Sequence, residues 1–174
     1  MRFFSPLLLC VFAAFLAACA PPKSDYAGLE TRAIKALSAA ETTRYQKGEG
    51  GGDALAAELN GFAGPKHVLE FAEQLQLTPL QLRQTRDLFA RMQKESRAYG
   101  AALIEEEQRL DAFFAEGGGD DLQMLTILGT IGKLRALVRY AHLSAHLRQN
   151  AILDEEQRLL YIELRGYHNH NDDH

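Results

Sequence analysis

Apolar residues recur at helical spacing through two long stretches of the chain. No strong helix breaker lies between Thr78 and Gly117. Apolar side chains there recur at multiples of seven residues in two sets offset by three, namely Leu82, Phe89, Leu103 and Leu110, with Met92, Tyr99 and Phe113. This pattern predicts one helix of roughly forty residues that presents a seam to a partner helix.

The second stretch runs from Asp120 or Asp121 to about Asn150. Its seam consists of Met124, Ile127, Ile131, Leu134, Val138, Ala141 and Ala145. Only glycines 117–119 separate the two stretches, so the helices should fold back as an antiparallel hairpin. No segment alternates with the period of two that indicates a strand. We therefore predict an all-α fold, a long antiparallel helical hairpin with short N-terminal and C-terminal helices packed on it.

Start and stop signals define the other helices. Thr78 is a good N-cap for the first long helix, because Pro79 suits the first helical position and Gln81 can reach back to the cap. Similar signals predict short helices over residues 26–37, 38–46, 53–59, 67–75 and 154–165, and Gly166 is placed to end the last one.

The first residues have the features of an export signal. Arg2 supplies a positive charge, and the apolar stretch 6–16 is shorter than the roughly 20 residues that span a bilayer. Leu16-Ala17-Ala18-Cys19 resembles a bacterial lipobox, which predicts a lipid on Cys19 and a protein anchored in the periplasm. No aspartate follows Cys19, which favours the outer membrane. The alternative is ordinary signal cleavage after Ala20.

The predicted organisation has four parts: a lipoprotein signal peptide (1–18), a tether with short N-terminal helices (19–62), a helical hairpin domain (63–167) and a polar tail rich in His and Asp (168–174). The only cysteines are Cys10 and Cys19, so the mature chain would hold no disulfide. The net charge is −4, without a basic patch interleaved with aromatics, which argues against nucleic acid as a partner. No nucleophile, phosphate-loop or HExxH motif occurs, so we expect no enzyme activity.

Two short motifs resemble the LTxxQ motifs of the Spy/CpxP-type periplasmic proteins. Leu77, Thr78 and Gln81 carry the first motif, and Leu153, Asp154 and Gln157 carry the second, in which aspartate replaces threonine. Asp154 can still cap a helix. The resemblance covers roughly residues 26–167. It implies a non-catalytic stress-response protein that binds unfolded proteins, transition metals or both, often as a dimer, in some cases with a sensor-kinase or anti-sigma partner.

A metal site is the leading functional prediction. His142 and His146 are four residues apart on a predicted helix, so both imidazoles lie on one face within reach of one ion. His67 and Glu70 are the further candidate donors if their helix packs against the second long helix. The ion would be a divalent transition metal, Zn, Ni, Co or Cu. The alternative is a pair of partly buried histidines that bind no metal.

A holdase chaperone for unfolded envelope proteins is the second prediction, and a structural envelope lipoprotein is the third. The chaperone would use cations mixed with apolar groups along the hairpin, through charge steering followed by apolar contact. The cations concerned are Arg83, Arg86, Arg91, Lys94, Arg97, Arg135, Arg139 and Arg148.

Overall fold

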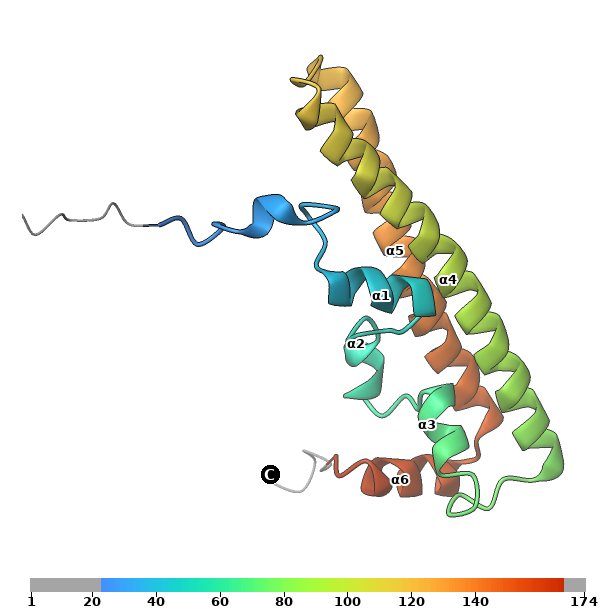
Figure 1. The fold of residues 1–174 in the computed structure, drawn as a ribbon. Helices are drawn as coiled ribbons and strands as arrows, with labels where there is room; N and C mark the ends of the chain where they lie inside the picture. Colours follow the sequence, from blue (N-terminus) through green and yellow to red (C-terminus); the bar gives the residue numbers. More distant parts are fainter. Residues whose placement is uncertain (1–22, 168–174) are drawn as a thin grey trace, which may run out of the picture.

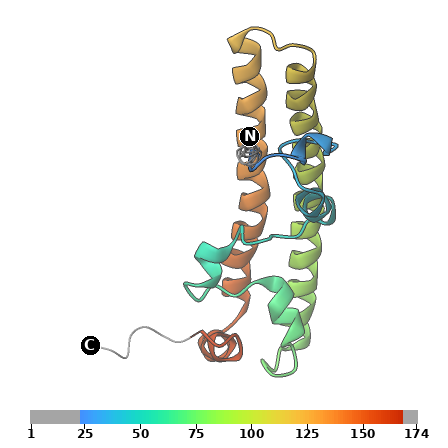
Figure 2. The ribbon, with the colours of Figure 1, turned by 60° about the vertical axis from the view of Figure 1, so that its left-hand side comes forward.

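Two long antiparallel helices form the framework of the protein. The computed structural model describes residues 23–167, and within them helix α4 (Pro79–Ala115) runs beside α5 (Asp121–Ile152). Every regular element in this range is helical, which confirms the predicted all-α hairpin (Figures 1 and 2). Cys19, the predicted signal peptide and the tail 168–174 lie outside the described residues.

The hairpin begins and turns where the sequence predicted. Thr78 caps α4 in a complete capping box with Gln81, and Pro79 is the first helical residue. The Asp120 side chain caps α5 by accepting hydrogen bonds from two backbone amides of its first turn. Gly117 and Gly118 adopt φ values of 97° and 76°, which favour glycine, and so allow the tight reversal between the helices.

Apolar packing between α4 and α5 forms the main core. The predicted seam residues Leu103, Ile127, Ile131 and Val138 are buried there together with Ile104, while Tyr99, Leu110, Phe113 and Leu134 pack against them from its edge. A smaller cluster of Leu88, Met92 and Ala145 continues the seam toward the open end of the hairpin. Both predicted seams therefore face each other.

Three polar bridges cross the same seam. Gln149 Nε2 donates to Thr85 Oγ1 at 3.1 Å, and Ser96 Oγ lies 3.0 Å from His142 Nε2. Farther along, Arg135 contacts the buried carboxylate of Glu107 at 2.6 Å.

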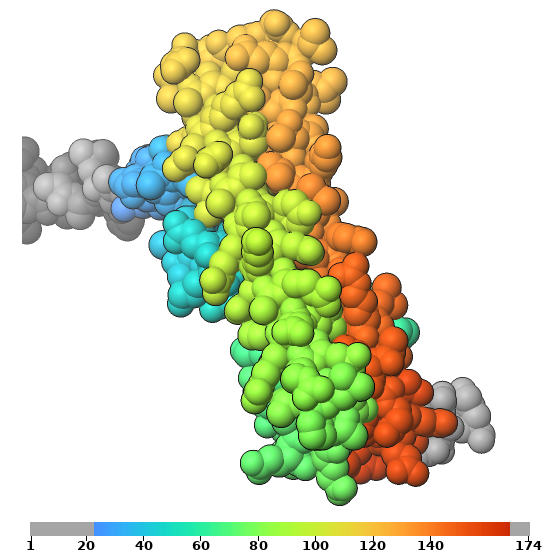
Figure 3. Space-filling model, turned by 90° about the vertical axis from the view of Figure 1, so that its right-hand side faces the viewer, coloured from blue at the N-terminus to red at the C-terminus, as the bar shows by residue number. Residues whose placement is uncertain are grey.

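The shorter elements lie along one side of the hairpin and across its open end. Helices α1 (Ala39–Lys47) and α3 (Pro65–Glu70) contact α4, and α2 (Leu55–Glu58) contacts α5. Helix α6 (Glu155–Leu164) turns away at the open end, whereas the half of the hairpin near its turn projects beyond α1 (Figure 1). Figure 3 shows α4 and α5 forming one continuous face, with N-terminal elements only at its edge.

A close backbone approach docks α1 on α4. A Cβ added to Gly100 would lie 2.6 Å from the carbonyl oxygen of Tyr45, closer than such atoms can approach. Glycine at this position therefore permits the contact. Tyr45 itself is buried in the main core together with Ile34 and Leu37.

Two of the predicted short helices differ in the structure. The helix expected over 26–37 is wrong: only a 3-10 turn, η1 (Leu29–Thr31), forms, because local side chains satisfy the backbone instead. Glu30 Oε2 accepts from the Gly28 amide at 2.6 Å, and Thr31 Oγ1 donates to the Gly28 carbonyl at 2.7 Å. The helix expected over 67–75 ends at Glu70, and turns lead from there to Gln76, whose φ is 49°.

Candidate functional site

The two predicted motifs meet at the open end of the hairpin. Gln81 Nε2 donates to Gln157 Oε1 at 2.8 Å, and Gln157 Nε2 donates back to Gln81 Oε1 at 3.2 Å. Each glutamine also completes a capping box, Gln81 with Thr78 and Gln157 with Asp154. We call this reciprocal pair the glutamine clasp. Motifs about 75 residues apart thus become one structural unit.

The glutamine clasp also bonds two carbonyl groups of the chain. Gln157 Nε2 donates to the Leu75 carbonyl at 3.0 Å, and Gln81 Nε2 donates to the Ile152 carbonyl at 3.0 Å. Leu153, the first residue of the second motif, is buried in an apolar cluster against which Leu77 of the first motif packs. The predicted motif residues therefore converge. Their role here is to join the start of α4 to the end of α5 and to the start of α6.

The predicted metal donors on α5 are both buried and hydrogen-bonded. His142 Nε2 contacts Ser96 Oγ, while His146 Nδ1 lies 2.8 Å from the Phe62 carbonyl and 3.6 Å from Glu58 Oε2. Burial lowers the pKa of His142 against the opposing effect of the Asp53 carboxylate, and the neighbouring His146 and Arg44 act in the same direction as burial. His142 is therefore neutral near pH 7.

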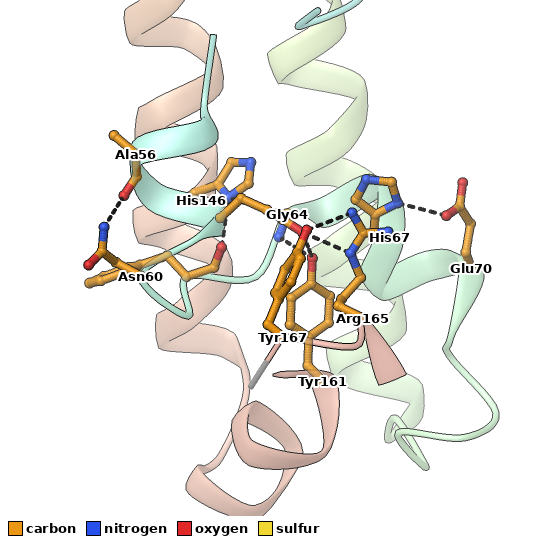
Figure 4. Close-up of polar contacts among 11 residues, drawn as sticks. Ala56, Asn60, Gly64, His67, Glu70, His146, Tyr161, Arg165 and Tyr167 are labelled. Atoms are coloured by element: carbon orange, nitrogen blue, oxygen red, sulfur yellow. Dashed lines mark hydrogen bonds and ion pairs between the residues drawn. The ribbon is translucent and has the colours of Figure 1, made fainter. Parts of the chain in front are cut away.

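The other two predicted donors pair with each other on α3. His67 Nδ1 lies 2.8 Å from Glu70 Oε2, and this hydrogen bond holds the pKa of Glu70 below its usual value. Figure 4 shows His67 and His146 on opposite sides of Gly64. Within residues 23–167 no three His, Cys, Asp or Glu side chains form a group able to hold an ion. The four predicted donors are thus not gathered at one point.

Glycines of the N-terminal segment lie against both α5 histidines. A Cβ on Gly50 would lie 3.2 Å from His142 Nδ1, and a Cβ on Gly64 would lie 3.0 Å from His146 Nε2. The segment that joins α1, α2 and α3 therefore covers the two imidazoles. Each ring has one nitrogen bonded within the protein and the other facing a glycine.

Glu58 organises a buried polar cluster that the sequence did not reveal. Its Oε1 accepts from Tyr161 at 2.7 Å, from Arg165 Nε at 2.9 Å and from Tyr167 at 3.2 Å. Figure 4 labels these three partner residues. Tyr161 also accepts from the Gly64 amide, and burial together with the bond to Glu58 raises the pKa of Tyr161. The cluster ties α2 to α6. Because its members are about 100 residues apart in the sequence, no local sequence pattern reveals it.

Helix α5 carries a second apolar face that sequence reasoning also missed. It points away from α4 and consists of Leu122, Leu125, Gly129, Gly132, Ala136, Tyr140, Leu143 and Leu147. Leu122 is 70% exposed, Leu125 64%, Tyr140 57% and Leu147 61%. We call it the second seam. The signal that reveals it is the same spacing of three and four residues that defines the seam toward α4.

Comparison with models of known families, with curated proteins and with solved structures finds no match for this chain. Among residues 23–167, no helix combines the length and the apolar character that crossing a membrane requires.

The glutamine clasp should show strong energetic coupling. We expect Gln81→Ala and Gln157→Ala each to cost about 1–3 kcal/mol, because each leaves the other amide, buried at Gln157 and half-buried at Gln81, without its partner. The double variant should lose less than the sum, with a coupling of about 0.5–3 kcal/mol in urea unfolding. Gln108→Ala, at an exposed position on α4, is the control. Strict additivity of Gln81→Ala with Gln157→Ala would contradict the reciprocal contact.

Acid should weaken the fold through His142. Because the folded pKa lies below the unfolded value of 6.5, the unfolded chain takes up the proton first as the pH falls below 6.5. The free energy of unfolding should therefore decline from that pH downward until the folded pKa is reached. We expect His142→Asn to flatten this decline by up to about 1.4 kcal/mol per pH unit in urea titrations between pH 7.5 and 5. An unchanged slope would show that the pKa of His142 is the same in the folded and the unfolded chain.

Proposed function

We propose that the chain is a non-enzymatic, LTxxQ-type protein of the bacterial periplasm, anchored in the outer membrane through Cys19. We further propose that it holds unfolded or partly folded envelope polypeptides during stress. The glutamine clasp supports the LTxxQ-type assignment, since both motifs contribute equivalent capping glutamines to it. The second seam is the observation that carries the holding activity.

A helix that is apolar on two faces needs cover on both. Helix α4 covers one face of α5, whereas the second seam exposes four large side chains over about 38 Å at 1.5 Å per residue. An exposed apolar stripe of this length marks a surface for binding polypeptide. Extended or helical client segments would contribute apolar side chains to it without a defined sequence.

Cations on α4 support the first step of such binding. Arg83, Arg86, Arg91 and Lys94 are exposed on α4 (Figure 3 shows this helix face-on). These cations, among which the exposed Asp87 also lies, would steer acidic, unfolded chains toward the hairpin before apolar contacts form. The binding should accordingly weaken in high salt.

The test is an aggregation assay with a chemically denatured client. Wild-type protein should suppress light scattering near stoichiometric ratios. The Leu125→Glu variant should need at least roughly ten times as much protein for the same suppression of light scattering, because burying one leucine contributes about 1.5–3 kcal/mol. Leu159→Glu is the matched control, since Leu159 is 50% exposed on α6, away from the second seam. Equal suppression by both variants, or none by the wild type, would remove the proposal.

Metal binding is the second candidate function. Two neighbouring imidazoles on α5 each keep one ring nitrogen that faces a glycine, and the ring that burial keeps neutral, His142, is in the form a metal needs. The bond from His146 Nδ1 to the Phe62 carbonyl fixes the orientation of the ring, as the hydrogen bond on the other ring nitrogen does in metal-bound histidines. An ion would have to displace the N-terminal segment, which would couple metal binding to a change in shape.

Calorimetric titration with zinc, nickel, cobalt or copper tests this candidate. We expect one ion per chain and a loss of binding in His142→Ala with His146→Ala. His67→Ala with Glu70→Ala serves as the comparison, because that pair lies apart from the α5 histidines. If the α5 double variant binds metal with wild-type affinity, the proposed ligands are wrong.

A further inference from the structure

The two long helices differ in charge. Helix α4 carries six acidic and six basic residues, whereas α5 has one acid, Asp121 in its first turn, and four cations. These cations are Lys133, Arg135, Arg139 and Arg148. The chain as a whole has a net charge of −4, so the positive charge of α5 is a local feature. A partner that binds along α5 should therefore be anionic.

The cations of α5 lie on both sides of the second seam. At about 100° per residue, Lys133 and Arg148 fall on one side of the apolar stripe. Arg135 and Arg139 fall on the other side, and all four residues are exposed. The second seam is thus an apolar stripe with positive charge along both of its edges.

The carboxylates near these cations are already paired. Arg135 bonds the buried carboxylate of Glu107, and Asp53, which lines a groove together with Arg139, pairs with Arg44. The other three cations of α5 occur in none of the ion pairs within residues 23–167. Three positive charges therefore remain for an anionic partner.

Large apolar side chains gather beside the same charges. Helix α5 exposes five of them, Leu122, Leu125, Leu128, Tyr140 and Leu147, whereas the longer α4 exposes two, Leu80 and Phe114. Helix α2 lies beside α5 on the side away from α4 (Figure 2), and the exposed Leu55 and Leu59 stand at its two ends. An apolar helix face flanked by cations and carrying a tyrosine is typical of helices that lie in a membrane interface.

We infer that α5 rests with its second seam on an anionic lipid bilayer. The leucines enter the boundary between headgroups and acyl chains, while Lys133, Arg139 and Arg148 contact lipid phosphates on both sides of the helix. The inference rests on the seam of the proposed function and on its anchor at Cys19, which would keep the seam beside the bilayer at high local concentration. The bilayer covers the seam when no client is bound, so client and bilayer compete.

Vesicle binding tests this contact without the lipid anchor. A chain from Ala20 to His174 contains every described element and no cysteine to acylate. It should sediment with vesicles that contain phosphatidylglycerol, and far less with vesicles of phosphatidylcholine alone. Replacing Lys133, Arg139 and Arg148 together by glutamine should weaken this binding at least about tenfold, because each cation at an anionic surface contributes about fivefold. No binding to the anionic vesicles would overturn the inference.

A matched variant on α4 separates this face from general attraction of charge. Replacing Arg83, Arg91 and Lys94 by glutamine removes the same charge from exposed positions on the side of α4 turned away from α5. These positions would lie farther from the bilayer than the Debye length of about 8–10 Å, so binding should weaken less than about threefold. Equal losses in the two triple variants would contradict the proposed orientation.

An introduced tryptophan reports whether the seam enters the lipid. The chain has no tryptophan of its own. With anionic vesicles, Leu125→Trp should shift its emission to the blue and be quenched by lipids with brominated acyl chains. Leu80→Trp is the control, since Leu80 is 56% exposed on α4. Unchanged emission at position 125, or equal quenching at both positions, would refute contact through the second seam.

The outcomes also separate this inference from the proposed function. A chain that suppresses client aggregation but binds no vesicles would refute the membrane contact and leave the holding activity standing. A chain that binds vesicles as stated but protects no client would refute the holding activity alone. If both are correct, anionic vesicles should reduce the suppression of aggregation, whereas phosphatidylcholine vesicles should not.

Discussion

The exchange of hydrogen bonds between Gln81 and Gln157 is the contact on which the open end of the hairpin depends. Four segments converge there: the turn after α3, the start of α4, the end of α5 and the start of α6. Each bond contributes only about 0.5–1.5 kcal/mol, but a lost partner leaves a buried amide unsatisfied at about 1–3 kcal/mol. The contact therefore selects one arrangement of these segments more than it adds stability.

The polar bridges within the hairpin act in a similar way. An apolar seam alone tolerates displacement of one helix along the other, because leucine and isoleucine are nearly interchangeable in such contacts. The hydrogen bonds of Thr85 with Gln149 and of Ser96 with His142 can form in only one register of α4 against α5. The side chain of Glu107 is 2% exposed, and any shift of α5 along α4 would separate it from Arg135 and leave an unpaired buried charge. Together they define a single alignment of α4 and α5.

Local signals were enough to predict the long helices and their caps. Thr78, Asp120 and Asp154 cap helices because their side chains reach amides two or three residues away, and that chemistry is visible in a short window of sequence. The expected helix over 26–37 failed for a related reason, since Glu30 and Thr31 bond the backbone locally in a competing arrangement.

The candidate sites were harder to predict because their partners are distant in the chain. Glu58 meets Tyr161 across 103 residues, and no local pattern distinguishes it from a solvated glutamate. The α5 histidines were correctly placed on one face, yet their surroundings depend on how the N-terminal segment lies over them. The second seam was present in the spacing and was missed because the first seam already accounted for a partner.

The Glu58 cluster has a consequence for the order of folding. The hairpin joins neighbours in the chain, so α4 and α5 can pair as soon as both are synthesised. Glu58 on α2 has no such option, because the side chains that hold it belong to residues 161, 165 and 167, at the far end of the described chain. Helix α1 can already dock on α4, but Glu58 must wait for its partners until residue 167 has been synthesised. Until then, the segment around Glu58 exposes surface that the finished fold buries, as partly folded chains do.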